Sequence, residues 1–501
     1  MRKNILNTAL LLLLAFVAGA CSDSDTTKKV DNGLRSGAGT ILELLNTDED
    51  ALSSLSFSLG ANSYIVGINC DGDWTASVDA DWVTLSNYAG YGFANKYSYD
   101  KVSVSKNMGE ERTATVTFTT GSISKSLVIT QKGTGGDADD PFETSFELVE
   151  NLVMGYNLGN TLDANPDITN PETAIWFKPA SDLDWETSWG QPLTTQKIVD
   201  AIAEKGFNII RVPVTWYPHM DAQDNVSAEW MNRVQEVVDY VLNAGCYCIL
   251  NVQHDNGAGN GRTDGGAWLY ADIDDYPTLT VRYQKLWKQI AERFKDYDQH
   301  LIFESFNEIL NKSYSWTAPS SVTDGAYQAI NKLQQDFVNL VRETGGNNKY
   351  RNLAVTTYAA TGANDVTLQA FELPNDPSSN HLYLSIHSYD PWNFCNKNSG
   401  KNDDGTEYDY NIQVFDADCE ATIDGVFARV SKRASEVGIP FIFGEFGAID
   451  ESKSMAERIK YAKYLKTKFQ QYEAVGLWWM GLYDRKKNEW YEEDIVNALL
   501  K

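Results

Sequence analysis

The chain has 501 residues, which is too long for one typical domain and long enough to bury a large core. Its formal net charge is −27 at pH 7, and its sequence pI is near 4.5. A surface this acidic repels the phosphates of nucleic acid and the charges of polyanionic glycans. The composition therefore excludes nucleic acid as a partner and favours an uncharged one.

The N-terminus has the pattern of an export signal. Arg2 and Lys3 precede an apolar stretch over residues 5–20, which ends in small residues directly before Cys21. A charged start, an apolar stretch and small residues, in this order, are typical of a secretory signal peptide, and the stretch is too short for a membrane span. We therefore predict a lipoprotein signal peptide over residues 1–21.

The residues around Cys21 resemble a bacterial lipobox, in which the cysteine becomes the lipidated N-terminus after cleavage. The acidic residues that follow resemble the surface-export signal of lipoproteins in the Bacteroides group. This resemblance implies a lipid anchor on Cys21 and a protein on the outer face of the cell outer membrane. Residues 22–47 are polar and lack periodicity, so we expect a flexible tether, whose roughly 25 residues have a root-mean-square reach of about 27 Å.

The cysteines do not indicate a disulfide framework. Five of the six follow the predicted lipidation site, and an odd number cannot all pair. Cys246 and Cys248 lie two apart on a predicted strand, a spacing that we do not expect to form a metal site by itself. Cys395 with Cys419 is the one bridge that we consider.

Short alternating runs over residues 48–133 predict a small antiparallel sandwich of the immunoglobulin-like kind. The segments 74–77, 82–86 and 128–131 resemble the BACON module, the Bacteroidetes-associated carbohydrate-binding often N-terminal module. The resemblance leaves two roles open, sugar binding and spacing. We favour a spacer, because Trp74 and the tryptophan of segment 82–86 fit core positions at least as well as a binding platform.

Residues 134–141 are rich in Gly and Asp and end in a proline, so we predict a linker there. From residue 142 to 501, amphipathic helix patterns alternate with short apolar strands. For example, Leu286, Ile290 and Phe294 recur at helical spacing before the apolar run 301–303. Repeated helix-then-strand units over this length predict the α/β class and a (β/α)8 TIM barrel.

Two glutamates stand at the ends of apolar runs. Glu308, preceded by Asn307, follows the run 301–306, and Glu445 lies within the segment 441–447. The ends of parallel barrel strands converge on one face, so carboxylates far apart in sequence can meet in one cleft. Two facing carboxylates are the minimal equipment for cleaving a glycosidic bond.

Polar residues end the other predicted strands in the same way. In chain order these segments are 155–160, 210–213, 252–255, 307–308, 386–389, 444–447 and 477–479. The series resembles glycoside hydrolase family 5 over residues 146–501. This resemblance implies a retaining double displacement, in which Glu308 is the acid/base and Glu445 is the nucleophile. Glu308 must be protonated when it donates, and Glu445 must be ionised when it attacks.

The same resemblance assigns three residues around the glutamates. It places Arg211 near the nucleophile, where its charge favours the ionised form of Glu445. It also implies that Tyr389 donates its hydroxyl near the nucleophile and that His387 orients the acid/base. A buried arginine in a barrel is otherwise a structural ion-pair partner.

Three further residues are implied to bind the sugar. Asn307 grips the 2-hydroxyl, an interaction that strengthens in the transition state. His254 contacts another hydroxyl, and Trp479 lies beneath the sugar ring. Trp478 and Trp479 face opposite ways on a strand, so one of them is core. The family usually has Trp-Asp-Asn-Gly at this place, whereas this chain continues from Trp479 with Met-Gly-Leu.

The lipobox, the N-terminal module and this site together are most similar to the cell-surface endo-xyloglucanases of Bacteroides species. They imply a monomeric, retaining endo-β-1,4-glucanase that hydrolyses the backbone of xyloglucan, a neutral plant polysaccharide, without a metal or cofactor. Cellulose, mixed-linkage glucan and mannan remain alternative substrates, because substrate choice depends on loops. A non-catalytic glycan-binding lipoprotein is disfavoured, because both glutamates are present together with Arg211, His387 and Tyr389.

Overall fold

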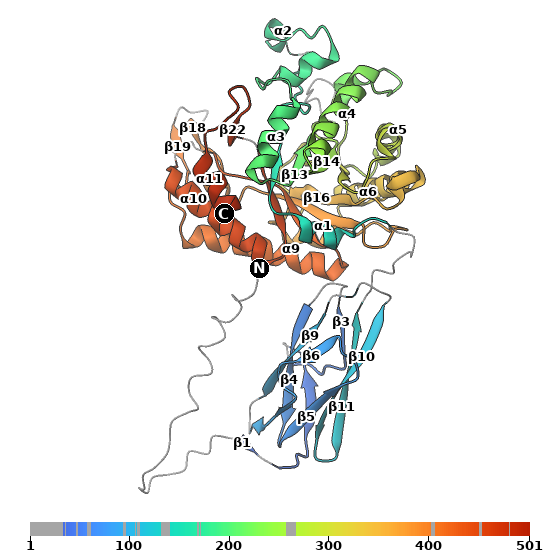
Figure 1. The fold of residues 1–501 in the computed structure, drawn as a ribbon, viewed down its shortest axis with the longest axis vertical. Coiled ribbons are helices and arrows are strands. Elements are labelled where there is room, and N and C mark those ends of the chain that lie inside the picture. Colours follow the sequence, from blue (N-terminus) through green and yellow to red (C-terminus); the bar gives the residue numbers. More distant parts are fainter. Residues whose placement is uncertain are drawn as a thin grey trace. The chain divides into compact units, whose positions relative to one another are not determined.

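The computed structural model describes residues 34–35, 37–46, 49–57, 62–93, 97–105, 107, 111–131, 141–167, 170, 172–256, 267–401, 406–449, 453–479 and 481–501. It divides into two compact units, an N-terminal one made of β-strands and a second one with the barrel (Figure 1). Within the described ranges, no helix combines the length and the apolar character needed to cross a bilayer. The predicted signal peptide, Cys21 and most of the predicted linker lie outside the described residues.

The N-terminal unit is an antiparallel sandwich of two sheets, as predicted. One sheet has the strand order β3-β11-β10-β5-β7 and the other β2-β4-β9-β6, while β1 pairs with β8. The strands are β1 (Leu34–Arg35), β2 (Leu42–Leu45), β3 (Ser54–Phe57), β4 (Asn62–Cys70), β5 (Trp74–Val78), β6 (Val83–Leu85), β7 (Ala89–Gly90), β8 (Gly92–Phe93), β9 (Ser98–Val104), β10 (Arg112–Thr120) and β11 (Ile123–Gln131). Val116 and Phe118 of β10 are fully buried and alternate with less buried neighbours, which is the period of a half-buried strand.

The tether prediction is wrong for its C-terminal part, because the sandwich begins before residue 48. Strand β2 pairs with β4 in the register Leu42↔Cys70, and Leu42, Leu44 and Leu45 are buried. Trp74 is buried as expected, with its ring centroid 5.7 Å from that of Phe118. The sandwich therefore needs residues that the sequence analysis had assigned to a flexible segment.

The second unit is a closed barrel of eight parallel strands, which confirms the predicted (β/α)8 fold. The barrel strands are β12 (Gly155–Asn157), β13 (Ile209–Val212), β14 (Tyr247–Asn251), β15 (Leu301–Glu304), β16 (Leu353–Thr361), β17 (Leu382–Ser388), β20 (Phe441–Phe446) and β21 (Val475–Trp479). Two small hairpins lie outside it, β18 (Ser399–Lys401) with β19 (Glu407–Asp409) and β22 (Tyr483–Asp484) with β23 (Glu489–Trp490).

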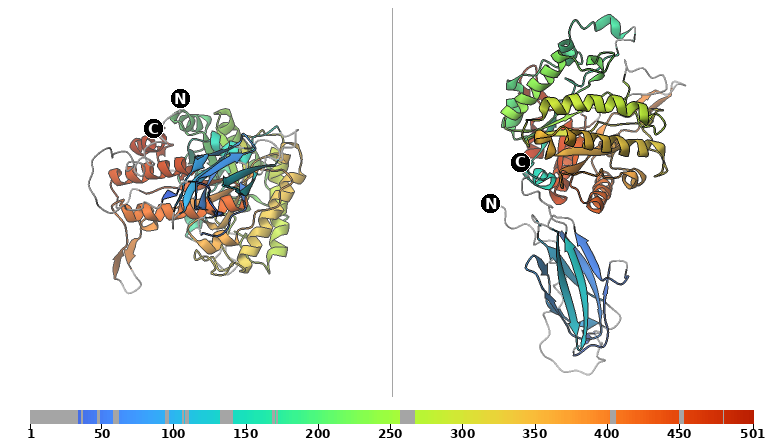
Figure 2. Two further views of the ribbon diagram at one scale, coloured as in Figure 1. Left: turned by 90° about the horizontal axis from the view of Figure 1, so that it is seen from below. Right: turned by 90° about the vertical axis from the view of Figure 1, so that its right-hand side faces the viewer.

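Helices surround the strands. They are α1 (Ser145–Asn151), α2 (Thr173–Trp176), α3 (Gln196–Lys205), α4 (Ala228–Asn243), α5 (Tyr276–Phe294), α6 (Gly325–Glu343), α7 (Asp365–Ala370), α8 (Trp392–Cys395), α9 (Ala417–Val437), α10 (Met455–Gln471) and α11 (Glu493–Leu500), with 3₁₀ turns at Asp182–Thr187, Tyr217–His219 and Gly346–Lys349. In the right-hand view of Figure 2, α5 and α6 run side by side across the outside of the barrel.

Local signals place the helix ends. The side chain of Ser227 accepts from the backbone N–H of Trp230 at the start of α4, and Asp324 does the same for Ala326 at the start of α6. Between its ends, α5 buries the stripe that includes Leu286, Ile290 and Phe294, as its periodicity predicts.

The barrel interior is apolar at one end and polar at the other. Inward-facing residues of the strands, such as Ile209, Ile249 and Ile302, form one buried cluster, and Leu148 and Val149 of α1 belong to the same cluster. Helix α1 therefore packs against the end of the barrel where the strands begin, called the lower end below. The upper end, where the strands finish, is left for polar residues.

The considered bridge between Cys395 and Cys419 is wrong. Both are buried free thiols, and so are Cys70, Cys246 and Cys248. Burial raises the pKa of the Cys395 thiol, so this cysteine is held protonated inside the fold.

Candidate active site

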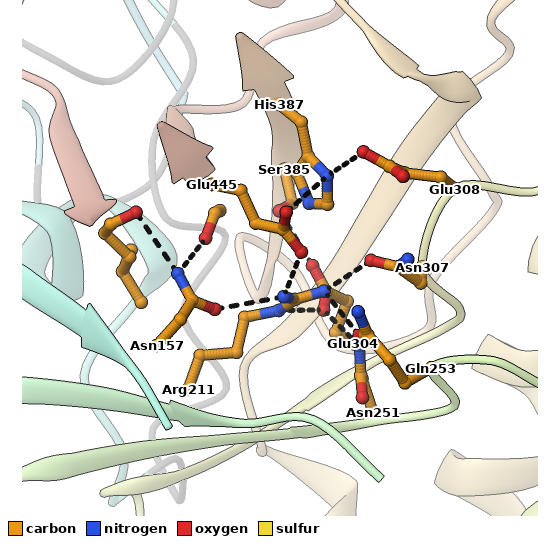
Figure 3. Close-up of polar contacts among 12 residues, drawn as sticks. Asn157, Arg211, Asn251, Gln253, Glu304, Asn307, Glu308, Ser385, His387 and Glu445 are labelled. Carbon is orange, nitrogen blue, oxygen red and sulfur yellow. Dashed lines mark hydrogen bonds and ion pairs between the residues drawn. The ribbon is translucent and has the colours of Figure 1, made fainter. Parts of the chain in front are cut away.

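Arg211 is the centre of the site. It lies on β13, is completely buried, and directs its guanidinium group across the upper end of the barrel (Figure 3). Its Nε donates to Glu304 at 2.6 Å, and one terminal nitrogen donates to Glu445 at 2.7 Å and to Asn157 at 3.0 Å. The other terminal nitrogen donates to Asn307 at 2.9 Å and to Gln253 at 3.2 Å. Five acceptors thus match the five N–H groups that a guanidinium carries.

Glu445 lies on β20 and is the carboxylate that Arg211 holds. Its second oxygen accepts from the hydroxyl of Tyr389 at 2.8 Å and lies 3.6 Å from Nδ1 of His387. Burial alone raises the pKa of Glu445, but the charges of His387 and Arg211, together with the hydrogen bonds from Tyr389 and Arg211, outweigh it. The resulting pKa lies below the ordinary value, so Glu445 is held ionised.

Glu308 lies in the loop after β15 and faces the same space. Its Oε1 is 2.7 Å from Nδ1 of His387, which lies on β17. Burial lowers the pKa of His387, but the charge of Glu445 and the contact with Glu308 raise it above its ordinary value. His387 therefore lies between the two glutamates. Sequence analysis predicted its contact with Glu308 but not its closeness to Glu445.

The oxygens of the two glutamates come close without touching. One ligand atom each from Glu308, His387 and Glu445 lies within 4.8 Å of the other two. Such a group of donors is also able to hold a divalent cation. Here, however, Arg211 already occupies one oxygen of Glu445 and supplies the positive charge that a cation would bring.

Of the predicted sugar-binding residues, Asn307 belongs to the network around Arg211. Asn307 is buried, and its Oδ1 accepts from Arg211, which fixes the orientation of its amide. His254 has a side chain that is 32% exposed, with Nε2 3.8 Å from the buried carboxylate of Asp163. The ring of Trp189 lies 5.6 Å from that of His254, centroid to centroid. Burial raises the pKa of Asp163.

The two adjacent tryptophans of β21 divide as expected. Trp478 is 2% exposed and belongs to the core, whereas Trp479 is half-buried and borders a cavity that Tyr389 also lines. A Cβ atom on Gly159 would come within 2.7 Å of the indole ring of Trp479. Glycine at this position therefore lets the ring lie close against the loop after β12.

Sequence analysis missed a second buried carboxylate, Glu304. Besides Arg211, it accepts from Ser385 at 2.8 Å and from Asn251 at 3.1 Å. A signal was present, because Glu304 stands two residues after the interior residue Ile302, and side chains two apart on a strand share a face. A charged residue at that spacing in an apolar run indicates a buried ion pair.

Residues 177–482 match the family model described as cellulase, glycosyl hydrolase family 5. The chain belongs to glycoside hydrolase family 5. Residues 72–132 match the BACON model, described as a putative N-terminal binding domain. Endoglucanase A of Clostridium longisporum is 33% identical over 405 residues, which cover 77% of this chain and 70% of that protein.

Two solved structures of family 5 are also similar. A variant of PbGH5A from Prevotella bryantii, in complex with a xyloglucan tetradecasaccharide, is 38% identical with a TM-score of 0.62, and the match covers 72% of this chain and 98% of that one. A Bacteroides ovatus GH5 xyloglucanase in complex with the XXXG heptasaccharide is 25% identical with a TM-score of 0.60. That match covers 92% of this chain and 99% of the other.

The buried ion pairs predict the stability of Arg211 variants. Arg211→Met should destabilise the barrel by about 3–5 kcal/mol at neutral pH, because it leaves two carboxylates buried without their cation. Replacing Arg429, whose pair with Asp365 is 3.9 Å long and partly exposed, should cost at most about 1 kcal/mol. Urea unfolding of each variant measures both values.

The double variant Arg211→Met, Glu304→Gln tests the cause of the loss. Removing one of the two buried charges left without a partner should recover part of the lost stability, with a coupling energy of about 0.5–3 kcal/mol. A double variant that is no more stable than Arg211→Met alone would show that lost packing, rather than the unpaired buried charge, accounts for the loss of stability.

Proposed function

We propose that this family 5 protein is a retaining endo-β-1,4-glucanase that cleaves the backbone of xyloglucan. The observation that carries the proposal is the unequal environment of two facing carboxylates. Arg211 and Tyr389 hold Glu445 ionised, while Glu308 is bonded to His387 alone among the side chains given above. Carboxyl groups in retaining enzymes lie about 5–5.5 Å apart, against about 6.5–9.5 Å in inverting ones. Here one oxygen of Glu308 lies within 4.8 Å of one oxygen of Glu445, which favours the retaining class.

The reaction has two steps. In the first, Glu308 gives its proton to the glycosidic oxygen as the bond from that oxygen to C1 breaks, and the Glu445 carboxylate bonds to C1. In the second, Glu308 takes a proton from water, the water oxygen bonds to C1, and the ester to Glu445 breaks. Both carboxyl groups return to their starting states, so no metal or cofactor takes part in this proposal.

The sugar-binding residues stabilise the transition state of both steps. Asn307 is the donor to the 2-hydroxyl of the reacting sugar, because Arg211 holds its Oδ1 and so turns its Nδ2 away from the guanidinium. His254 is a contact to another hydroxyl, and Trp479 is the ring beneath the sugar.

Xyloglucan is the proposed substrate because two of the similar structures hold fragments of that polysaccharide. The acidic surface suits a neutral polymer. Cellulose, mixed-linkage glucan and mannan are the alternatives, and the name Endoglucanase A of the relative favours an unbranched glucan. A reducing-end assay on xyloglucan, barley glucan, glucomannan and carboxymethyl cellulose, run side by side, decides among them.

The mechanism predicts retention of configuration. Early hydrolysis followed by proton NMR should show the β-anomer first, and Glu445→Gln should abolish turnover without unfolding the barrel. Glu308→Ala should slow polysaccharide hydrolysis far more than hydrolysis of aryl glycosides with good leaving groups, because only the poor leaving group needs the proton. Appearance of the α-anomer first would contradict the proposal.

The contacts of Glu445 predict a pH dependence. Tyr389→Phe removes a hydrogen bond that lowers the pKa of Glu445, and the pKa of Glu445 should therefore rise. As the pH falls, the variant should lose the ionised form of Glu445 at a higher pH than the wild type does. The acidic limb of kcat/KM should therefore move to higher pH. Tyr464→Phe is the matched control, because the Tyr464 hydroxyl also donates to a carboxylate at 2.8 Å, that of Asp424 on α9. An unchanged acidic limb in Tyr389→Phe would contradict the assignment of Glu445 as the group that must be ionised.

We further propose that Cys21 carries a lipid and holds the enzyme at the outer face of the outer membrane. The support is the order of charged, apolar and small residues before Cys21 and the acidic residues after it. Cells fed labelled palmitate should incorporate label into the protein, and Cys21→Ala should remove the label and release the protein from the membrane fraction. Label that persists in Cys21→Ala would refute lipidation at this residue.

A further inference from the structure

The loop that carries Glu308, residues 305–311 after β15, is held by its backbone and is called the acid/base loop here. The carbonyl oxygen of Glu308 accepts from Nδ2 of Asn256 at 2.6 Å. The carbonyl oxygen of Ile309 accepts from the backbone N–H of Ala359 at 3.0 Å. Asn256 follows β14 and Ala359 belongs to β16, so the loop is held from the strands on both sides of β15.

The amide of Asn256 is held in turn by the segment opposite it. Asn256 forms a parallel bridge with Leu269, and Ala271, two residues later, forms one with Asn311. The backbone N–H of Ala271 donates to the carbonyl of Leu310 at 2.8 Å. Residue 256 and the end of the acid/base loop thus contact the same short segment. A carbonyl only accepts, so the nitrogen of the Asn256 amide has to face Glu308.

Strand β16 reaches the acid/base loop through a bulge. Thr356 pairs with Ser385 and Thr361 pairs with His387, so residues 357–360 stand opposite a single residue of β17. Extra residues of this kind bend a strand away from its partner and redirect its groups, and bulges are common beside active sites. This bulge ends beside the histidine that bonds the acid/base.

The bulge contains strained backbone. Ala359 and Ala360 have φ angles of 53° and 50°, in the left-handed region that alanine rarely adopts, because its Cβ atom comes too close to the backbone there. Strained residues persist only where the surrounding structure holds them, and they cluster at functional sites. In this conformation the N–H of Ala359 reaches the carbonyl of Ile309 in the acid/base loop.

A tyrosine of the same bulge holds the continuation of the loop. Tyr358 is 1% exposed, and its ring packs edge-on against that of Tyr327 on α6, with the centroids 6.0 Å apart. Its hydroxyl donates to the carbonyl of Ser315 at 2.5 Å and accepts from the backbone N–H of Asn311 at 3.1 Å. One hydroxyl group thus uses both its donor and its acceptor function to tie the loop to β16.

We propose that Asn256 and Tyr358 are positioning residues for Glu308. Both act through the backbone of the acid/base loop, which fixes where the Glu308 carboxyl group lies relative to the glycosidic oxygen. The proposal rests on the acid/base role proposed above for Glu308. Proton transfer needs the two heavy atoms within hydrogen-bond reach, so a shift of about 1 Å in the loop costs roughly a hundredfold in rate.

The test varies only the leaving group. Dinitrophenyl and phenyl β-glycosides are compared on the same sugar, once on cellotriose and once on the XXXG heptasaccharide, and kcat/KM reports the first chemical step. Only the phenyl group needs a proton to depart. Asn256→Ala and Tyr358→Phe should each lower kcat/KM by about tenfold to a hundredfold on the phenyl glycoside, and by less than about threefold on the dinitrophenyl glycoside. Glu308→Ala is the reference and should show the same selectivity.

Two variants are matched controls for lost hydrogen bonds. Asn331→Ala removes an amide that donates to the carbonyl of Ala370 at 2.9 Å, and Tyr327→Phe removes a hydroxyl that donates to the carbonyl of Pro319 at 2.8 Å. Neither of these bonds involves the acid/base loop. Both controls should lose stability in thermal unfolding to about the same extent as the test variants. Their ratio of kcat/KM on the two glycosides should equal that of the wild type.

Each outcome decides one claim. A variant of Asn256 or Tyr358 that loses kcat/KM equally on both glycosides, or on neither, overturns the positioning role of that residue. If Glu308→Ala loses kcat/KM selectively and neither test variant does, the positioning proposal is wrong while the acid/base role stands. If Glu308→Ala itself shows no selective loss, the acid/base role is wrong and the positioning role falls with it.

Discussion

The buried guanidinium of Arg211 is the interaction on which the site depends. It joins two carboxylates that come from different strands, Glu304 of β15 and Glu445 of β20, and it lies in the closed interior of the barrel. Burying a charge without partners costs several kcal/mol, so neither carboxylate is stable there unless the arginine is in place. Burial alone lowers the pKa of Arg211, but the two carboxylates raise it, so the group stays charged. The fold and the chemistry therefore share one set of contacts.

The polar layer follows from the period of two in a β-strand. Gly155, Ile209, Ile249, Ile302, Tyr383 and Leu477 face the lower interior or stand at its level, and the residues two positions later are Asn157, Arg211, Asn251, Glu304, Ser385 and Trp479. Strand register places Asn157 beside Arg211 and Asn251 beside Glu304. Two positions along five of these strands, the interior thus changes from apolar packing to the hydrogen-bonded side chains of Asn157, Arg211, Asn251, Glu304 and Ser385.

The sequence predicted the barrel, the sandwich and the glutamate pair, because periodicity and the ends of apolar runs are local signals. Arg211 and Tyr389 contact Glu445, and His387 contacts Glu308, while the roles that the resemblance to family 5 implies for them stay predictions. The spacing of Glu304 from Ile302 indicated a buried charge, but its partners Arg211, Asn251 and Ser385 come from other strands, and strand pairing is not visible in one sequence. The start of the sandwich was missed because strand β2 has only four residues, Leu42–Leu45, and gains its stability from pairing with β4. The considered disulfide between Cys395 and Cys419 was wrong, because the spacing of two cysteines in the sequence does not give the distance between them in the fold.

In the function proposed above, chemistry and selectivity are carried by different parts of the barrel. The carboxylates and their partners stand on strands or in the loops that follow them, and the closed sheet fixes where those strands end. Asn396 and Tyr491 lie in the connections between elements, where residues can change without disturbing the network under Glu445. Tyr491 follows β23 and lines the same cavity as Trp479 of β21. Within that proposal, a change of substrate is expected to come from changes in the loops, with the ion pairs of Arg211 retained.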